Sequence, residues 1–82
     1  MAALEHARMR LNNVLQGPLR DRRLTWEDYS EGPPHNVTWT SIAYLNNIEW
    51  GRGTGPSRGA AKENAARAVL DALVTDGLIA AA

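Results

Sequence analysis

Two basic side chains stand at the start of a predicted helix, directly after the glycine-rich range 51–57. They are Arg58 and Lys62. The first turn of a helix has free N–H groups and the positive end of the helix dipole, and it therefore attracts anions such as phosphate. Cations at this position are mildly unfavourable to the dipole, so they favour an anionic partner. The stretch predicts a phosphate-binding site.

A second candidate is the loop Gly32-Pro33-Pro34-His35. His35 is no evidence for a metal site, because His6 is the only other histidine and the chain has no cysteine. Its imidazole either meets a ligand or bonds backbone to fix the loop, and the two roles are compatible. No nucleophile–base pair, carboxylate pair or metal cluster can be assembled from the chain. We therefore expect no enzyme activity, no catalytic residue, no metal and no cofactor.

Length and composition limit what these residues can belong to. The 82 residues, 44% of them hydrophobic, suffice for one small domain with a single core. The absence of cysteine suits a reducing compartment. The N-terminus lacks the apolar run of a signal peptide, and no stretch approaches the roughly 20 apolar residues of a membrane span. We expect an intracellular protein, cytoplasmic or nuclear.

The formal net charge is zero, but it is unevenly distributed. Residues 1–23 carry a balance of +3, residues 24–50 a balance of −4, and residues 51–82 a balance of +1. If the two ends of the chain share one face of the fold, that face is positive in a neutral molecule. The alternative is an evenly mixed surface. The arginines of the connector 19–23 either reach toward a polyanion or are plainly solvated.

Hydrophobic spacing predicts the elements that hold these residues. Apolar residues from Leu4 to Leu15 recur at helical spacing, and Gly17-Pro18 ends the pattern. A first strand is expected over Leu24–Ser30, where Glu27-Asp28 suggests a bulge or an edge position. A second strand is expected over Val37–Leu45.

The second strand alternates in residue type, so its two faces can be separated. Val37, Trp39, Ser41, Ala43 and Leu45 share one face, and Trp39 is expected in the core. Trp26 and Trp50 are expected to be core residues too, although exposed tryptophans can stack on bases. The opposite face is expected to expose four residues and to be available to a partner or a second copy: Thr38, Thr40, Ile42 and Tyr44.

Asn46-Asn47 tolerates positive φ and predicts a tight hairpin into a third strand, Ile48–Arg52. Gly53–Pro56 is expected to be a loop and Ser57 the N-cap of an alanine-rich helix that ends at Leu73 or Thr75. Gly77 stops this helix. Leu78 and Ile79 either belong to a frayed tail or fold back on the core.

These elements predict an α+β fold of order α-β-β-β-α, with a three-stranded antiparallel sheet and two helices packed on one face. The whole chain, residues 1–82, is expected to be one domain with a core of about 4–75 and a flexible tail over 76–82.

Several motifs in this order resemble the double-stranded RNA-binding domain family. They are Leu11-Asn12-Asn13-Val14-Leu15, Gly32-Pro33-Pro34-His35 with an aromatic residue four positions later, Gly53-Thr54-Gly55-Pro56-Ser57-Arg58-Gly59-Ala60-Ala61-Lys62, and Ala65-Ala66-Arg67-Ala68-Val69-Leu70. The resemblance covers about residues 4–75. It implies binding to A-form RNA over about 16 bp, through two minor grooves and the phosphates between them.

By position, the resemblance assigns three contact groups. The first helix would meet one minor groove, the loop the next one, and the start of the last helix the phosphates. The residues that match are Met9, Asn12, Asn13, Gly32, Pro33, Pro34, His35, Ser57, Arg58 and Lys62. Without the resemblance, the two asparagines would be taken as ordinary exposed helix residues.

The sequence departs from the family pattern at three positions. Gly59 replaces the second of three basic residues, Asn13 stands where an acidic residue is expected, and Pro34 fills a position that is often acidic. Fewer phosphate contacts imply modest affinity and a shallow dependence on salt. The alternative is a module of the same fold that binds proteins or forms a homodimer, through the exposed sheet face or the C-terminal tail.

Overall fold

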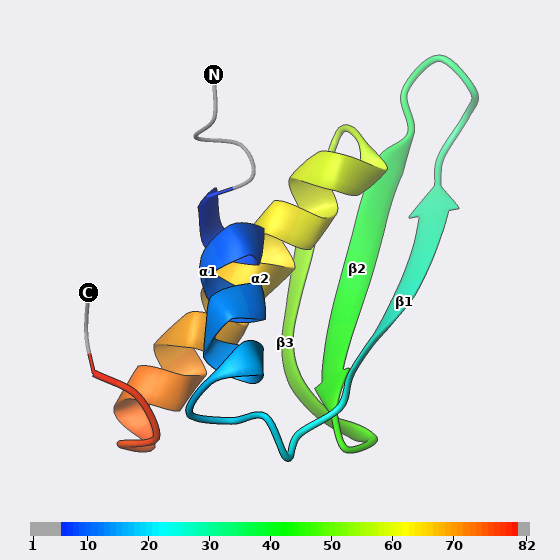
Figure 1. Ribbon diagram of the computed structural model, residues 1–82. Helices are drawn as coiled ribbons and strands as arrows, with labels where there is room; N and C mark the ends of the chain where they lie inside the picture. The colour runs from blue at the N-terminus through cyan, green and yellow to red at the C-terminus, as the bar shows by residue number, and fades with distance from the viewer. Residues whose placement is uncertain (1–5, 81–82) are drawn as a thin grey trace.

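The computed structural model describes residues 6–80, which form two helices and three strands (Figure 1). In chain order these are α1 (His6–Gln16), β1 (Leu24–Glu31), β2 (Thr38–Leu45), β3 (Ile48–Gly55) and α2 (Arg58–Thr75). The strands form one antiparallel sheet in the order β1-β2-β3, and both helices lie on the same face of it. The predicted fold class is confirmed. Leu4, Ala81 and Ala82 lie outside the described residues.

The hairpin between β2 and β3 has the predicted tight turn. Asn46 and Asn47 have φ angles of 51° and 68°, which suit the two central positions of a turn that matches the twist of the strands. Asn46 also holds the connector that precedes β1. Its side-chain oxygen accepts from the Arg23 backbone N–H at 2.8 Å, and its own N–H donates to the Arg23 carbonyl at 2.9 Å.

Both ends of α2 follow local signals in the sequence. At the start, the Ser57 hydroxyl accepts a hydrogen bond from the Ala60 N–H at 3.1 Å. At the end, Gly77 has a φ of 74°, and the Leu78 N–H donates to the Leu73 carbonyl at 2.9 Å. This closing motif turns the chain back, and Leu78 and Ile79 pack against the core. Among residues 6–80, neither helix has the length and apolarity that a bilayer crossing requires.

The predicted loop Gly53–Pro56 is wrong, because β3 continues to Gly55. Three alternate glycines of this strand, Gly51, Gly53 and Gly55, face α2. A Cβ at Gly51 would stand 2.8 Å from the Val69 backbone nitrogen, and one at Gly55 would stand 2.8 Å from the Ala60 Cβ. The glycines therefore allow a helix to approach the strand closely. In the sequence, a segment so rich in glycine looks like a loop.

The core lies between the sheet and the two helices. Its buried residues are Ala7, Leu11, Leu19, Ala43, Leu45, Ala66, Val69, Leu70 and Leu73. Trp26 and Trp50 pack against this cluster, as predicted, but Trp39 does not belong to it. Trp39 does lie on the predicted face of β2, since it shares the helix-facing side with the buried Ser41 and Ala43. Trp39 lies near the end of the sheet, however, where Arg58 of the first turn of α2 stands over its ring, and it stays half-buried.

The position of β1 at the edge of the sheet is confirmed, whereas no bulge occurs at Glu27-Asp28. The pairing of β1 with β2 is continuous from Leu24 opposite Leu45 to Glu31 opposite Thr38. The irregularity of the sheet falls instead between β2 and β3, next to Ala43 and Tyr44.

Candidate nucleic-acid interface

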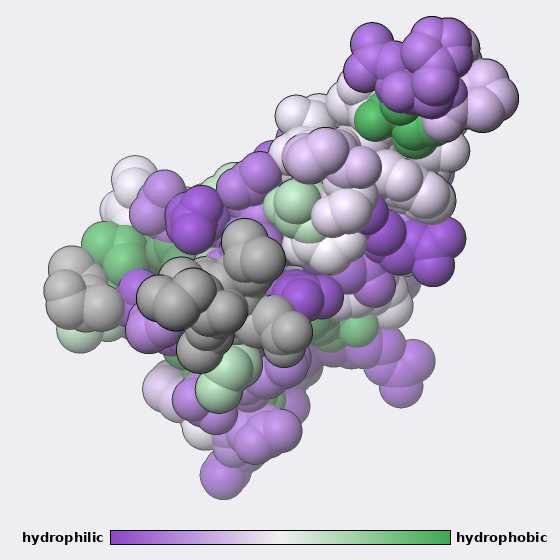
Figure 2. All heavy atoms as spheres, turned by 90° about the horizontal axis from the view of Figure 1, so that it is seen from above, coloured by the Kyte–Doolittle hydropathy of each residue, from purple (hydrophilic) through white to green (hydrophobic). Residues whose placement is uncertain are grey.

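The ten predicted contact residues fall on α1, on the β1–β2 loop and on the first turns of α2. The pairing of Trp39 with Gly55 brings the start of α2 to the end of the sheet that carries the β1–β2 loop. Figure 1 shows both at the same end of the molecule, with α1 alongside α2. Figure 2 looks onto this end, where the loop stands out from the body and the surface is largely hydrophilic.

The α1 group consists of Met9, Asn12 and Asn13, all exposed, with Met9 at 59%. Positions 9, 12 and 13 are spaced by three and four residues, so the three side chains share one face of the helix. The opposite side carries the buried Ala7 and Leu11. The structure therefore presents this group to solvent together.

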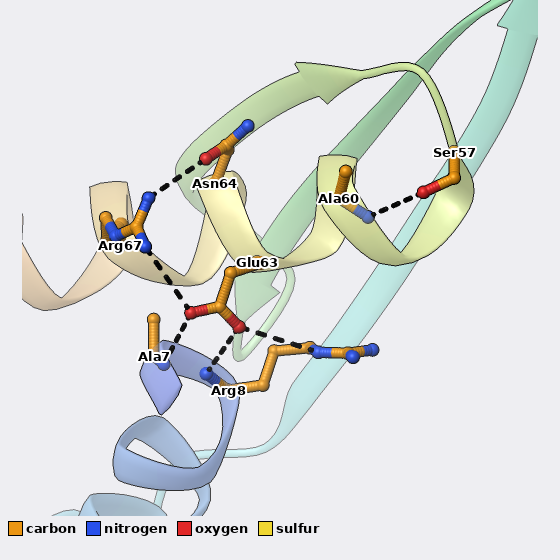
Figure 3. A network of polar contacts seen from close by, with 7 residues as sticks. All are labelled: Ala7, Arg8, Ser57, Ala60, Glu63, Asn64 and Arg67. Atoms are coloured by element: carbon orange, nitrogen blue, oxygen red, sulfur yellow. Dashed lines mark hydrogen bonds and ion pairs between the residues drawn. The ribbon is translucent and has the colours of Figure 1, made fainter. Parts of the chain in front are cut away.

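A buried carboxylate holds the first turn of α1 against α2 (Figure 3). Glu63, 2% exposed, accepts from the Ala7 N–H at 2.6 Å and from the Arg8 N–H at 3.4 Å. Its oxygens lie 3.8 Å from the Arg8 Nε and 3.9 Å from an Arg67 nitrogen. A carboxylate at this end of a helix satisfies free N–H groups and complements the dipole. Glu63 thus sets the position of the helix that carries the first predicted contact group.

The β1–β2 loop is exposed throughout its first part, from Gly32 to His35. Gly32 has a φ of 102°, and a Cβ there would stand 2.7 Å from the Asn36 carbonyl oxygen, so the loop requires glycine at this position. The turn is closed by the Asn36 N–H, which donates to the Pro33 carbonyl at 2.9 Å. The bond that closes the turn is therefore a backbone bond, and it leaves the His35 ring at the surface.

The first turn of α2 presents one exposed cation, Arg58. Its guanidinium carbon lies 4.7 Å from the ring centroid of Trp39, within the range of a cation–π contact. The ring carries no net charge, so this contact does not neutralise the guanidinium. Ser57 is exposed beside it, although its hydroxyl is used as the cap. A Cβ at Gly59 would meet no atom within 4 Å, so the missing basic residue leaves this part of the surface open.

Unlike Arg58, Lys62 is paired with a carboxylate of the protein. Its Nζ lies 3.4 Å from Asp28 Oδ2, with side chains only 25% and 16% exposed, and 5.3 Å from the Trp26 ring centroid. The anionic partner that a cation in this position favours is thus a residue of the protein itself. Arg58 and Lys62 neighbour each other on α2, but they differ in what holds them.

The connector arginines are placed away from the α2 start. Arg20, Arg22 and Arg23 precede Leu24, which pairs with Leu45 at the opposite end of the sheet from the β1–β2 loop. The Arg22 guanidinium carbon lies 5.7 Å from the Trp50 ring centroid. Three of the five arginines of the first 23 residues therefore lie away from Arg58 and Lys62.

The sheet face away from the helices is polar and internally bonded. Thr40 and Ile42, predicted to be exposed there, are only 8% and 6% exposed, and both lie on the central strand β2, which has a neighbouring strand on each side. Tyr44 donates to Glu27 at 2.7 Å, and this bond raises the pKa of the Tyr44 hydroxyl. Arg52 donates to Glu49 at 2.7 and 2.8 Å and lowers the pKa of the Glu49 carboxyl.

A cavity of about 340 Å³ opens between α1 and α2. It is lined by His6, Ala7, Arg10, Glu63, Arg67, Leu70 and Asp71. None of the ten predicted contact residues lines it. Within residues 6–80, no three His, Asp or Glu side chains are grouped as metal ligands.

Sequence reasoning missed Asp28 and Glu63, although each carried a signal. Strand alternation places Asp28 with Leu24 and Trp26 on the side that faces the helices, where a carboxylate needs a partner. Glu63 precedes the buried Ala66 and Leu70 by three and seven residues, which places it on the α1-facing stripe of α2. A charged residue within a buried stripe indicates a specific polar contact.

Two comparisons with known proteins agree with this arrangement. Residues 11–73 match the family model of the double-stranded RNA binding motif. The chain is also 39% identical over 57 residues to Ribonuclease 3 of Corynebacterium efficiens. That match covers 66% of this chain and 23% of the ribonuclease, so the chain spans less than a quarter of the length of this relative.

Proposed function

Because this chain belongs to the double-stranded RNA-binding motif family, we propose that it binds double-stranded RNA and catalyses no reaction itself. A-form RNA has a wide, shallow minor groove lined by 2′-hydroxyls and a deep major groove bordered by phosphates. These features are common to all base sequences. The proposed binding therefore depends on helix shape and has little sequence preference.

Three groups of residues make the proposed contacts. Met9, Asn12 and Asn13 on α1 enter one minor groove, where an asparagine amide can both donate to and accept from a 2′-hydroxyl. The loop from Gly32 to His35 enters the next minor groove. The phosphates between the grooves are bound at the start of α2, by the cation of Arg58 and the N–H groups of the first turn.

The observation that carries this proposal is the position of Arg58. Its exposed guanidinium is held over Trp39 at the end of the sheet from which the β1–β2 loop projects. A preformed cation beside a protruding loop suits a ligand with phosphates on one side of a groove. The match to a ribonuclease supports a role of this domain in gripping RNA for an RNA-processing enzyme.

The test is fluorescence anisotropy with a labelled RNA duplex of about 20 bp, which exceeds one family footprint. The same sequence as duplex DNA and as single-stranded RNA serves for comparison. We expect binding that is selective for duplex RNA and weakens as salt is raised. Absence of binding to the RNA duplex at low salt contradicts the proposal.

Arg58→Gln is expected to weaken binding to duplex RNA about tenfold at 0.1 M salt and to make the salt slope shallower by about 0.9, by analogy with duplex DNA. The physical reason is the loss of one phosphate contact. Titrations of the variant at several salt concentrations measure both effects.

Arg52→Gln is the matched control, since it makes the same change of charge on the opposite face of the sheet, where Arg52 pairs with Glu49. Its RNA affinity is expected to stay within about twofold of that of the parent. Equal losses in the two variants would indicate a general effect of charge and would remove Arg58 from the interface.

A protein-binding or dimerisation module is the second candidate function. The observation that favours it is Ile48, which is 64% exposed at the start of β3. Ile48 pairs opposite the buried Leu45 and so lies on the helix-facing side of the sheet. The open face carries the contacts of Tyr44 with Glu27 and of Arg52 with Glu49, which favours RNA over this alternative. Sedimentation of the protein without RNA distinguishes a dimer from a monomer.

A further inference from the structure

Asp28 is an acidic residue on the helix-facing side of β1, between the half-buried Trp26 and the start of α2. Its Oδ1 accepts a hydrogen bond from the Ser41 hydroxyl at 2.7 Å, and its Oδ2 lies 3.4 Å from the Lys62 Nζ. Ser41 is fully buried on the central strand and pairs opposite Asp28 in the sheet. The hydrogen bond from Ser41 on the neighbouring strand therefore holds the Asp28 carboxylate in place, and the Lys62 side chain reaches it from α2.

This arrangement restrains the Lys62 ammonium from two sides. The carboxylate of Asp28 lies at one side and the face of the Trp26 indole, 5.3 Å away, at the other. Side chains that are 25% and 16% exposed are screened less by water and salt than a fully exposed pair. A phosphate would have to draw the ammonium away from both and would approach an uncompensated carboxylate.

Among residues 6–80, Arg58, four residues earlier on the same helix, has no carboxylate partner. Its contact is the Trp39 ring, which attracts the guanidinium but carries no net charge and takes none of its five N–H donors. The two cations that the helix start offers to phosphate therefore differ in availability.

We propose that Asp28 limits the RNA affinity of this domain by holding Lys62 out of the phosphate site, so that Arg58 supplies the working cation. The inference rests on the proposed function. It makes Asp28 a residue that sets affinity without touching RNA. Removing the charge of Asp28 would therefore add one phosphate contact, made by Lys62.

Asp28→Asn tests this directly. Asparagine keeps the shape of the side chain and an oxygen that accepts from Ser41, and it removes the charge that holds Lys62. We expect the variant to bind the RNA duplex about tenfold more tightly at 0.1 M salt, with a salt slope steeper by about 0.9. Glu27→Gln is the matched control, because it makes the same charge change on the residue before Asp28 in β1, on the opposite face of the sheet. We expect its RNA affinity to equal that of the parent.

A double-mutant cycle with Lys62→Gln assigns the gain to the lysine. In the parent, Lys62→Gln is expected to change RNA affinity by less than about twofold, whereas in the Asp28→Asn background it is expected to abolish the tenfold gain. A large loss from Lys62→Gln in the parent would overturn the proposal, and this measurement does not depend on the folding of Asp28→Asn. Thermal melts by circular dichroism accompany each variant.

The outcomes separate this inference from the proposed function. If the parent and Asp28→Asn bind duplex RNA equally, RNA binding stands and the inference fails. If only Asp28→Asn binds at low salt, the proposed function of the parent fails, whereas the effect of Asp28 on Lys62 is supported. If neither binds duplex RNA at low salt, both fail.

Discussion

Gly53→Ala is expected to destabilise the domain by about 3 kcal/mol or more, enough to unfold much of a small domain near physiological temperature. The new Cβ would stand 2.7 Å from the carbonyl carbon of Asn64 and closer still to the Ala65 nitrogen. These are backbone atoms of α2, so no side-chain rotation relieves the contact. The helix has to move away from β3, and the packing of Ala61, Ala65 and Val69 on the sheet is lost with it.

Chemical denaturation followed by circular dichroism measures this effect, and Gly59→Ala provides the matched control. Gly59 lies in the first turn of α2, where a Cβ meets no atom within 4 Å. Alanine there is expected to stabilise the domain by up to about 1 kcal/mol, because glycine costs more backbone entropy in a helix. Similar unfolding midpoints for the two variants would show that α2 does not lie as close to β3 as described.

Glu63→Ala is expected to lower the free energy of unfolding by about 2–3 kcal/mol. The main cause is the buried N–H of Ala7, which loses its 2.6 Å acceptor. The two ion pairs contribute less, because their atoms lie 3.8 and 3.9 Å apart and the Arg8 and Arg67 side chains are partly exposed. Glu63→Gln keeps an acceptor for Ala7 and is expected to recover a large part of the loss.

The measurement is again the unfolding midpoint, with hydrogen exchange at the Ala7 amide as the local probe. Asp71→Ala is the control, since Asp71 is an exposed carboxylate of α2 that lines the same cavity. It is expected to change stability by no more than about 0.5 kcal/mol. If Glu63→Ala unfolds with the Asp71→Ala midpoint, the carboxylate does not hold α1, and the position of Met9, Asn12 and Asn13 must have another cause.

The difference between Arg58 and Lys62 alters what the helix-start motif implies. As a sequence, the two residues predict two equivalent phosphate contacts. In the fold, Arg58 rests on an aromatic ring and Lys62 on a carboxylate. Modest affinity was expected from the glycine at position 59, and the pairing of Lys62 adds a second, independent cause for it. The two causes are separable, because Asp28→Asn acts on one and leaves Gly59 unchanged.

The sequence by itself determined the order of the elements and most of their ends, because those depend on local chemistry. Gly17-Pro18 ends α1, Asn46-Asn47 adopts the positive φ of the hairpin, and the Ser57 hydroxyl caps α2. Each of these depends on interactions within a few residues, so residue type and spacing suffice. The three proposed contact groups were predicted from the resemblance to the family, whose motifs span most of the chain.

Only the tertiary structure decided which side chains are held by others. The glycines of β3 look like a loop in the sequence. Their role is to allow the backbones of β3 and α2 to approach each other closely, which is visible only in the fold. Strand alternation places Trp39 on the helix-facing side of β2 with the core residues. It lies beside the start of α2, however, and its ring contacts the Arg58 guanidinium. Asp28 reaches Lys62 across 34 positions of sequence, and Glu63 reaches Ala7 across 56. Partners so far apart leave no periodicity in the chain, since the contact depends on how a strand and two helices pack.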